Sequence, residues 1–438
     1  MHIDQTTLLD LSIFHPEEEQ SVFHQLNRTR TNAGRFWLRE FFNHPFNNLN
    51  SIEQTQQTLQ LILKEIANWP TIISNGTLMV LEKFYETQVD DIPRHPSAQS
   101  AFTYKLFHKA DFSIIKYTIG HFVDFLKGMR QVVDYFKDET VPAILETVLD
   151  NVKMILKNDT VSQILQVTNK ENISGVQVLE FGYFLRHRFK QHFFELIDLH
   201  GKLDAWYAMA ISTKELNFNF PLFENGAEPK FTSNGLFHIL LTIPIPYDIQ
   251  MDTQTNFVFL TGANMAGKST FIKAVGVATY LAHLGMGVPA KKMQLSLFHG
   301  LLSNIQVNDN IVKGESYFFN EVQRIKNTIV KINNGQKWLV LIDELFKGTN
   351  VQDAMNCSSA VIKGLIKIKS SLFILSTHLY EIGEELKVFP NIAFRYFETA
   401  VNDEQLTFSY QLKNGISNDR LGYLILKREK VIDLLERL

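Results

Sequence analysis

The residues best suited to chemistry lie in one glycine-containing stretch, Gly262 to Thr270. Gly262 and the run Gly267-Lys268-Ser269 fit the spacing G-x-x-x-x-G-K-[ST], which is typical of a phosphate-binding loop. The glycines allow backbone N–H groups to close around phosphate oxygens, and the start of the following helix adds a favourable partial charge. A chance glycine-rich turn is the alternative, but a β-forming run precedes this loop and a helical pattern follows it, as a phosphate-binding loop requires.

The loop predicts nucleotide binding without defining a reaction. Lys268 would reach the β- and γ-phosphates, and the hydroxyl of Ser269 would ligate Mg²⁺. The expected cofactor-binding residues are Gly262, Asn264, Met265, Gly267, Lys268, Ser269 and Thr270.

Two adjacent carboxylates supply the second element of the expected site. The apolar run 338–342 reads as a buried strand and ends in Asp343 and Glu344. A lone Asp-Glu pair after a strand is more often a solvated turn, but this pair follows the loop by about seventy residues and fits a Walker B motif. We expect Asp343 to hold the Mg²⁺ shell together with Ser269, and Glu344 to position and deprotonate the attacking water.

A histidine and a serine complete the expected catalytic set. His378 follows the apolar run 371–375 and would therefore lie at the carboxyl edge of the same sheet, within reach of a γ-phosphate; a capping or packing role is the alternative. Ser316 lies in the segment 314–321, between the two Walker elements. By itself Ser316 could simply cap the helix that follows.

The composition fits an ordinary globular protein. At 438 residues the chain can form two or three domains, and 45% hydrophobic with 20% charged residues argues against a disordered or fibrous class. The single cysteine, Cys357, excludes an intramolecular disulfide and a cysteine zinc site, so the cytoplasm is the simplest compartment. We expect no secretory signal and no membrane span, because no apolar run approaches the ~20 residues needed to cross a bilayer.

The charge is unevenly distributed along the chain. Residues 1–220 carry 21 Lys and Arg against 26 Asp and Glu, whereas residues 221–438 carry 22 against 20. Any contact with DNA would therefore need a local patch. Two basic clusters, 27–39 and 186–190, could contact phosphates, but we favour the interpretation that they are solvated helix faces.

The chain reads as two domains with different patterns. From Ser21 to about Thr213 helices follow one another, with breaks at prolines and a loop over 87–100. After residue 220 strands alternate with helices, and strands are expected at 236–242, 247–251, 256–260, 338–342 and 371–375. We therefore expect an all-helical domain over 1–220 and an α/β domain over 221–438. In the first domain, one helical stripe is formed by Phe122, Leu126, Met129, Val133 and Phe136.

Five motifs in this order resemble those of the MutS mismatch-repair ATPases, which are relatives of the ABC-type ATPases. The similarity lies in the loop 261–270, the helix exit 281–290, the segment 314–321, the Walker B and D-loop stretch 343–353, and the Thr377-His378 pair. Ala263 and Ala266 stand where that family usually has Pro and Gly. The resemblance is strong in the α/β half and looser in the helices.

The resemblance implies a fold, a ligand and a partner. The expected fold is an α/β P-loop ATPase domain of the ABC/MutS type, preceded by an all-helical core or lever domain. The implied ligands are ATP and Mg²⁺, and the implied assembly is a head-to-tail homodimer in which Ser316 of one subunit faces the γ-phosphate held by Lys268 of the other. The family's mismatch-reading and connector domains would precede this point, so we expect a short form that lacks them.

Three functions remain open from the sequence. The leading hypothesis is a cytoplasmic, Mg²⁺-dependent, MutS-like dimeric ATPase coupled to DNA binding or DNA repair. The first alternative is a nucleotide-gated DNA-binding module without mismatch recognition of its own. The second is an interaction protein whose protein partner supplies the recognition.

Overall fold

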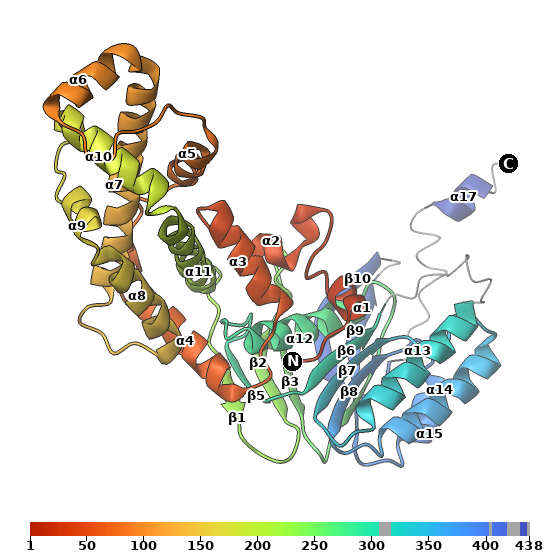
Figure 1. Ribbon diagram of the computed structural model, residues 1–438. Helices are drawn as coiled ribbons and strands as arrows, with labels where there is room; N and C mark the ends of the chain where they lie inside the picture. The colour runs from red at the N-terminus through yellow and green to blue at the C-terminus, as the bar shows by residue number, and fades with distance from the viewer. Residues whose placement is uncertain (306–316, 403–404, 418–429, 436–438) are drawn as a thin grey trace. The chain divides into compact units, whose positions relative to one another are not determined.

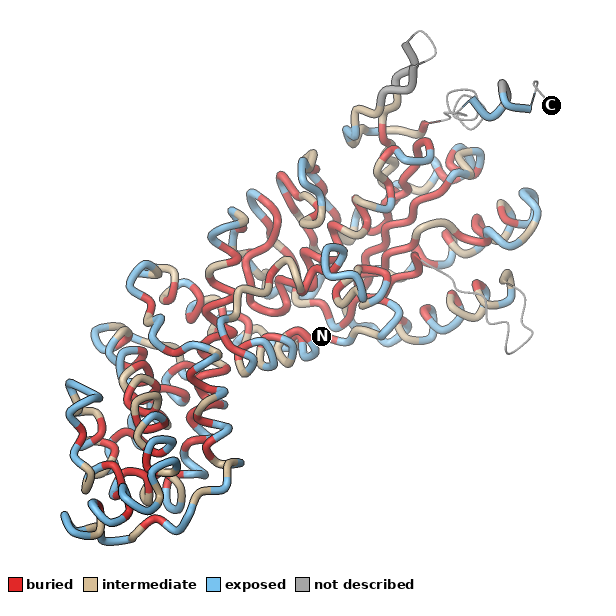
Figure 2. Tube along the Cα trace, turned by 90° about the horizontal axis from the view of Figure 1, so that it is seen from above, coloured by how far each residue is buried: buried red, intermediate tan, exposed pale blue. Residues whose placement is uncertain are grey.

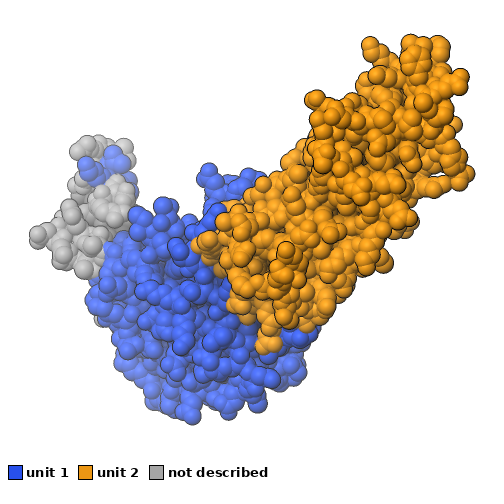
Figure 3. All heavy atoms as spheres, turned by 90° about the vertical axis from the view of Figure 1, so that its left-hand side faces the viewer, with its two compact units in different colours: residues 1–25, 44–52, 215–438 blue, residues 26–43, 53–214 orange. Residues whose placement is uncertain are grey.

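The computed structural model describes residues 1–305, 317–402, 405–417 and 430–435 and divides the chain into two compact units (Figure 3). The sheet unit comprises residues 1–25, 44–52 and 215–438, and the helical unit comprises residues 26–43 and 53–214. This division differs from the expected boundary near residue 220. It places the first 25 residues and residues 44–52 with the sheets.

A six-stranded, mostly parallel sheet is the centre of the sheet unit (Figure 1). Its strand order is β10-β9-β4-β8-β7-β6, and every neighbouring pair is parallel except β10 and β9. The strands are β4 (Phe257–Thr261), β6 (Gly300–Asn304), β7 (Trp338–Asp343), β8 (Ser371–Ser376), β9 (Ile392–Asn402) and β10 (Gln405–Asn414). The strands expected at 256–260, 338–342 and 371–375 are thereby confirmed.

Helices cover both faces of this sheet, which explains why the central strands β4, β7 and β8 are almost entirely buried (Figure 2). Val340 and Ile342 of β7 belong to a buried cluster with residues of α13 (Tyr317–Ile332), α14 (Val351–Leu365) and α15 (Glu381–Leu386). Leu341 points to the other face, where α12 (Lys268–His283) lies so close that a Cβ on Gly276 would be 2.8 Å from Leu341 Cδ1. The short α17 (Val431–Leu435) is the last described helix.

A second sheet has the order β1-β5-β2-β3. Its strands are β1 (Leu222–Glu224), β2 (Phe231–Leu236), β3 (Tyr247–Met251) and β5 (Lys292–Ser296). The strand expected at 247–251 is confirmed, whereas the one expected at 236–242 is wrong, because β2 ends at Leu236. The chain turns at His238, whose ring nitrogen Nδ1 and carbonyl accept the N–H groups of Leu240 and Leu241 at 3.3 and 3.2 Å.

The N-terminal residues join the sheet unit because they pair with β6. The N–H of His2 donates to the carbonyl of His299 at 2.7 Å, and the N–H of Leu301 donates to the carbonyl of His2 at 3.0 Å. The short helix α1 (Gln5–Asp10) follows, ahead of the 3₁₀ turn η1 (Glu18–Gln20). The buried Asp10 then accepts the hydroxyl of Ser303 at 2.6 Å and the N–H of Ile305 at 2.9 Å. Main-chain pairing of this kind leaves no side-chain pattern for sequence analysis to detect.

The helical unit is built from helices throughout its described length. Each residue of the stripe expected along 121–136 is buried, and prolines lie between helices as expected. The elements of this unit, together with α2 (Val22–Leu26), which lies mostly in the sheet unit, and α4, which begins there, are α3 (Asn32–Asn43), α4 (Leu49–Lys64), η2 (Ile66–Asn68), α5 (Asn75–Glu86), α6 (Ala98–Phe107), α7 (Lys109–Tyr135), α8 (Ala143–Leu156), α9 (Asp159–Leu165), η3 (Lys170–Asn172), α10 (Gly175–His187) and α11 (Lys190–Glu215). Three boundaries between the two units fall within α2, α4 and α11, close to one end of each helix, and the fourth falls directly after α3. None of the described helices is long and apolar enough to cross a membrane.

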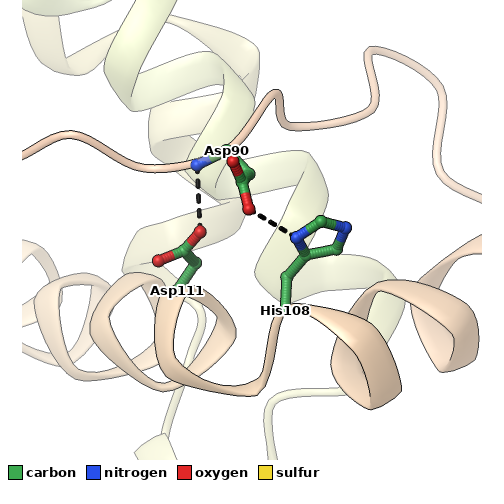
Figure 4. A group of neighbouring side chains, drawn as sticks. All are labelled: Asp90, His108 and Asp111. Atoms are coloured by element: carbon green, nitrogen blue, oxygen red, sulfur yellow. Dashed lines mark hydrogen bonds and ion pairs between the residues drawn. The ribbon is translucent and has the colours of Figure 1, made fainter.

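Polar contacts fix the loop that connects α5 to α6. Arg186 of α10 donates to the carbonyls of Phe84 and Thr87 at 2.6 and 2.7 Å. Asp90 in this loop contacts two residues near the start of α7. Its Oδ2 lies 2.5 Å from His108 Nδ1, and its N–H donates to Asp111 at 3.0 Å (Figure 4). Because Asp90 contacts His108 through its carboxylate and Asp111 through its backbone N–H, we interpret the three residues as a structural link rather than a metal site.

Asp204 joins the two ends of the helical unit. This side chain of α11 is 4% exposed and accepts the N–H of Thr31 at 2.9 Å and its hydroxyl at 2.7 Å, as well as the N–H of Arg30 at 3.0 Å. Gly34 allows this approach, since a Cβ there would lie 2.0 Å from Asp204 Oδ2. The carboxylate therefore fixes the start of α3 against α11.

Replacement of Asp204 by alanine should lower the free energy of unfolding of the helical unit by about 2 to 4 kcal/mol, because it leaves several buried donors without an acceptor. Urea denaturation followed by circular dichroism measures this change. Asp150→Ala is the matched control, because it removes an exposed ion pair to Lys153 and should change stability by less than about 0.5 kcal/mol. Equal stability of the two variants would contradict the assigned role of Asp204.

Candidate functional site

The candidate site lies at the carboxyl edge of the six-stranded sheet. The register pairs Leu260 of β4 with Ser376 of β8, and Ser376 with Asp343 of β7, so the three strands end at the same level. The segments that follow them carry the glycine loop, Glu344 and His378. Ligands of open parallel sheets bind at this edge, so the topology itself gathers these residues.

The glycine loop depends on backbone angles that glycine adopts most easily. Gly262 has φ of 138° and Gly267 has φ of 108°, and Met265 between them also has a positive φ of 67°. A Cβ on Gly262 would approach Phe397 at 3.3 Å, so a side chain there is disfavoured by both conformation and space. Gly267 is the residue before α12, whose first turn carries Lys268, and its conformation therefore sets the direction of that helix.

The ammonium group of Lys268 is held inside the loop. It donates to the carbonyls of Gly262 and Ala263 at 2.7 and 2.9 Å and lies 3.3 Å from His378 Nε2. Burial lowers the pKa of Lys268 to about 8, although the charges of Glu344 and Asp343 act in the opposite direction. A phosphate group at this position would offer the ammonium a stronger partner than the two neutral carbonyls.

Asp343 is surrounded by hydroxyl groups. Ser269 donates to its Oδ2 at 2.5 Å, and Ser376 donates to its Oδ1. A carboxylate beside a serine hydroxyl is an all-oxygen donor set of the kind that Mg²⁺ prefers, so these residues fit that ion. Ser376 joins the expected pair because strand register places it opposite Asp343.

The carboxylate of Glu344 lies between the basic side chains of His378 and Lys347. Its Oε1 lies 2.7 Å from His378 Nε2 and its Oε2 lies 3.2 Å from Lys347 Nζ. Burial acts to raise the pKa of Glu344, but the hydrogen bond from His378 and the charge of Lys347 outweigh it and hold the pKa at about 2. The residue also has a positive φ of 64°, a strained conformation that is common at functional positions. At neutral pH this carboxylate is therefore ionised and firmly oriented.

These groups line a cavity of about 920 Å³ whose lining also includes a set of apolar residues. This apolar wall consists of Leu241, Ile243, Ile245, Tyr247, Met265, Phe408 and Tyr410. Of these residues, sequence analysis expected only Met265 at the site. Ile243 is 88% exposed, and this exposed apolar residue lies in the turn after β2. A wall of this kind fits a flat, uncharged ring, while the polar residues fit phosphates and a cation.

A register shift brings Tyr410 into the cavity wall. The pairing of β10 with β9 is irregular between Phe408 and Leu412, and Tyr410 has a positive φ of 52°. Its ring comes so close to the loop that a Cβ on Gly267 would be 3.4 Å from Tyr410 Cδ1. A bulge of this type re-aims one side chain and leaves almost no signal in sequence.

The structure brings together most of the residues expected at the site. The cavity is lined by Asn264, Met265, Gly267, Lys268, Ser269, Thr270, Asp343, Glu344 and His378. Gly262 contributes its carbonyl to Lys268. Ser316 lies outside the described residues. Lys347 and Ser376 were not expected at the site, although both are neighbours of expected residues in sequence.

Comparison with known proteins identifies relatives of the region that contains this site. The family model of MutS domain V matches residues 258–432, a range that includes the glycine loop, Asp343, Glu344 and His378. The DNA mismatch repair protein MutS of Thermotoga maritima is 29% identical over 54% of this chain and 30% of its own length. The corresponding protein of Petrotoga mobilis is 26% identical over 54% of this chain and 29% of its own length.

A relative from yeast extends the similarity into the helices. The DNA mismatch repair protein MSH3 of Saccharomyces cerevisiae is 24% identical along an alignment that covers 98% of this chain and 53% of that protein. The chain thus spans about half or less of the length of these relatives. An all-helical region followed by mixed α/β sheets is the architecture that the MutS-type interpretation predicted. The C-terminal half of this chain therefore belongs to the MutS family as a MutS domain V, which is an ATPase domain.

Proposed function

We propose that the sheet unit binds ATP with Mg²⁺ and hydrolyses it to ADP and phosphate. The observation that carries this proposal is the convergence of Lys268, Ser269, Asp343 and Glu344 on one cavity at the carboxyl edge of the sheet. These four residues come from two segments about seventy positions apart, and strand register alone brings them together. Phosphoryl transfer depends mainly on positioning and charge stabilisation, and this arrangement supplies both.

Each polar residue has a distinct role in this proposal. Lys268 exchanges the carbonyls of its own loop for β- and γ-phosphate oxygens. Ser269 and Asp343 hold Mg²⁺, which neutralises phosphate charge when it is bound. Glu344 orients the attacking water, and His378, which contacts both Glu344 and Lys268, would donate to the γ-phosphate.

The low pKa of Glu344 determines whether this residue orients the attacking water or acts as a base. With a pKa of about 2, the carboxylate is a weak proton acceptor as long as His378 and Lys347 remain bound to it. We infer that it orients the water in this arrangement and becomes a stronger base only when one of these partners moves to a phosphate. The adenine ring would lie against the apolar wall that includes Tyr410 and Phe408.

A homodimer through the sheet unit is part of the proposal. The chain contains one glycine loop of this type, and the MutS resemblance implies that Ser316 of a second copy completes the site. The single cysteine in 438 residues supports the cytoplasm as the compartment. Sedimentation velocity with and without a nonhydrolysable ATP analogue tests the dimer, which a purely monomeric chain under both conditions would exclude.

We further propose that ATP turnover is coupled to DNA. Support comes from the relatives that are named DNA mismatch repair proteins and from the helical unit, which the yeast relative matches along with the rest of the chain. The acidic balance of residues 1–220 favours weak or structure-dependent binding over tight binding. A protein partner that supplies recognition is the alternative.

Lys268→Ala should weaken nucleotide binding about 10- to 100-fold, because it removes a charged donor to the phosphates. Glu344→Gln should bind ATP as the parent does and lower the hydrolysis rate about 100-fold or more, because it removes the carboxylate that orients water. Calorimetry with ADP and steady-state phosphate release measure the two effects. Lys273→Ala, which lies further along α12 and outside the cavity, is the control and should change neither. Parental hydrolysis by Glu344→Gln would refute the assigned chemistry.

Nucleotide binding should take up a proton at alkaline pH. With a pKa of about 8, Lys268 loses its charge as the pH rises through that value, and bound phosphates favour the charged form. The affinity for ADP should therefore fall above about pH 8. Calorimetry at pH 8.5 in Bicine and Tris buffers, which differ in ionisation enthalpy, measures the uptake. Lys268→Arg remains charged at this pH and should show none, so equal uptake by this variant would contradict the assignment.

The hydrolysis rate should change by at least about threefold with one member of a panel of duplex, mismatched and branched DNA, a modest coupling free energy for two linked sites. The same panel is used for a salt titration of binding, in which phosphate contacts give a steep negative slope. Rates and binding that are insensitive to every DNA at low salt would exclude coupling to DNA. If, in addition, a protein from a native extract were retained only in the presence of ATP, the results would favour a protein partner that supplies the recognition.

A further inference from the structure

Helix α13 carries a buried carboxylate that the proposed chemistry does not use. Glu321 is 5% exposed, and its two oxygens accept the backbone N–H groups of Lys347 at 3.0 Å and Gly348 at 3.1 Å. Burial of a carboxylate is costly unless hydrogen bonds compensate it, and here each oxygen has an amide donor. The residues that receive this contact form the loop directly after Glu344.

The loop after Glu344 has a conformation that needs outside support. Glu344 and Phe346 both have positive φ values, of 64° and 60°, in a stretch where neither residue is glycine. A segment with two such residues persists only when its surroundings hold it. The two amides bound by Glu321 follow immediately and supply such a restraint.

The first turn of α13 also packs directly on this loop. A Cβ on Gly348 would lie 2.7 Å from the backbone nitrogen of Phe318 and 2.7 Å from Tyr317 Cδ1. The rings of Phe318 and Phe346 lie 5.6 Å apart. Helix α13 and the loop are therefore in direct contact at two places besides the Glu321 bonds.

Lys347 extends this connection to the catalytic carboxylate. Its backbone N–H is bound by Glu321, while its ammonium lies 3.2 Å from Glu344 Oε2. A displacement of α13 would shift Lys347 and change the restraint on Glu344. The contacts thus form a continuous path from helix to carboxylate, and each step is a hydrogen bond or an ion pair within the sheet unit.

We propose that Glu321 is a positioning residue for hydrolysis, which couples helix α13 to Glu344 through the loop 345–348. The inference rests on the proposed ATPase function and adds to it a route by which movement of α13 sets the catalytic carboxylate. Glu321 itself does not touch substrate. Its effect is therefore on turnover and not on nucleotide binding.

The test compares Glu321→Ala and Glu321→Gln with Lys326→Ala, a change at an exposed position on the same helix. Glu321→Ala should lower kcat about 10- to 100-fold, as misplacement of a catalytic group does, with KM for ATP and calorimetric affinity for ADP within about threefold of the parent. Glu321→Gln retains one acceptor oxygen and should give an intermediate kcat. Lys326→Ala should match the parent.

Gly348→Ala provides a second route to the same result if Glu321→Ala folds poorly. This change leaves Glu321 in place but forces the loop away from Phe318, and it should also lower kcat with little change in KM. Parental kcat for both Glu321→Ala and Gly348→Ala in an active wild-type background would overturn the inference, as would equal losses of kcat and ADP affinity. An inactive wild type would instead refute the proposed function itself.

Discussion

The site depends on the register of three parallel strands. Because β4, β8 and β7 end at the same level, the glycine loop, His378 and Asp343 with Glu344 meet at one edge although they are far apart in the chain. A shift of one residue in either pairing would turn the apolar side chains of a strand to the opposite face, and both faces are packed by helices. Burial of the sheet on both sides therefore fixes the geometry of the chemistry at its edge.

Each charged side chain at this edge already has a partner within the protein. Lys268 is bound to neutral carbonyls, Lys347 and His378 are bound to Glu344, and Asp343 is bound to two hydroxyls. The neutral carbonyls on Lys268 are weaker partners than phosphate oxygens would be, and the hydroxyls on Asp343 are weaker partners than a divalent cation would be. Binding of a nucleotide would therefore rearrange contacts that already exist instead of creating a charged site from separate parts, which keeps the cost of organising the site low.

Sequence reasoning predicted the parts of this site that depend on local pattern. The glycine spacing, the Asp343-Glu344 pair after an apolar run and His378 after another run were visible because parallel strands and phosphate loops have strong signatures. The contacts that were missed depend on tertiary structure. Tyr410 reaches the cavity through a bulge, Glu321 acts through backbone amides of a distant loop, and His2 joins the sheet by main-chain pairing. The strand expected at 236–242 was wrong because His238 starts a turn there.

The central claim is that this edge binds the phosphates of ATP through Lys268. The most direct measurement is a crystal structure of the protein with Mg²⁺ and a nonhydrolysable ATP analogue. The account predicts that Lys268 Nζ leaves the carbonyls of Gly262 and Ala263 for the β- and γ-phosphates, that the cation lies between Ser269 and Asp343, and that the adenine ring lies against Tyr410. A nucleotide bound elsewhere, with Lys268 still on the two carbonyls, would contradict it.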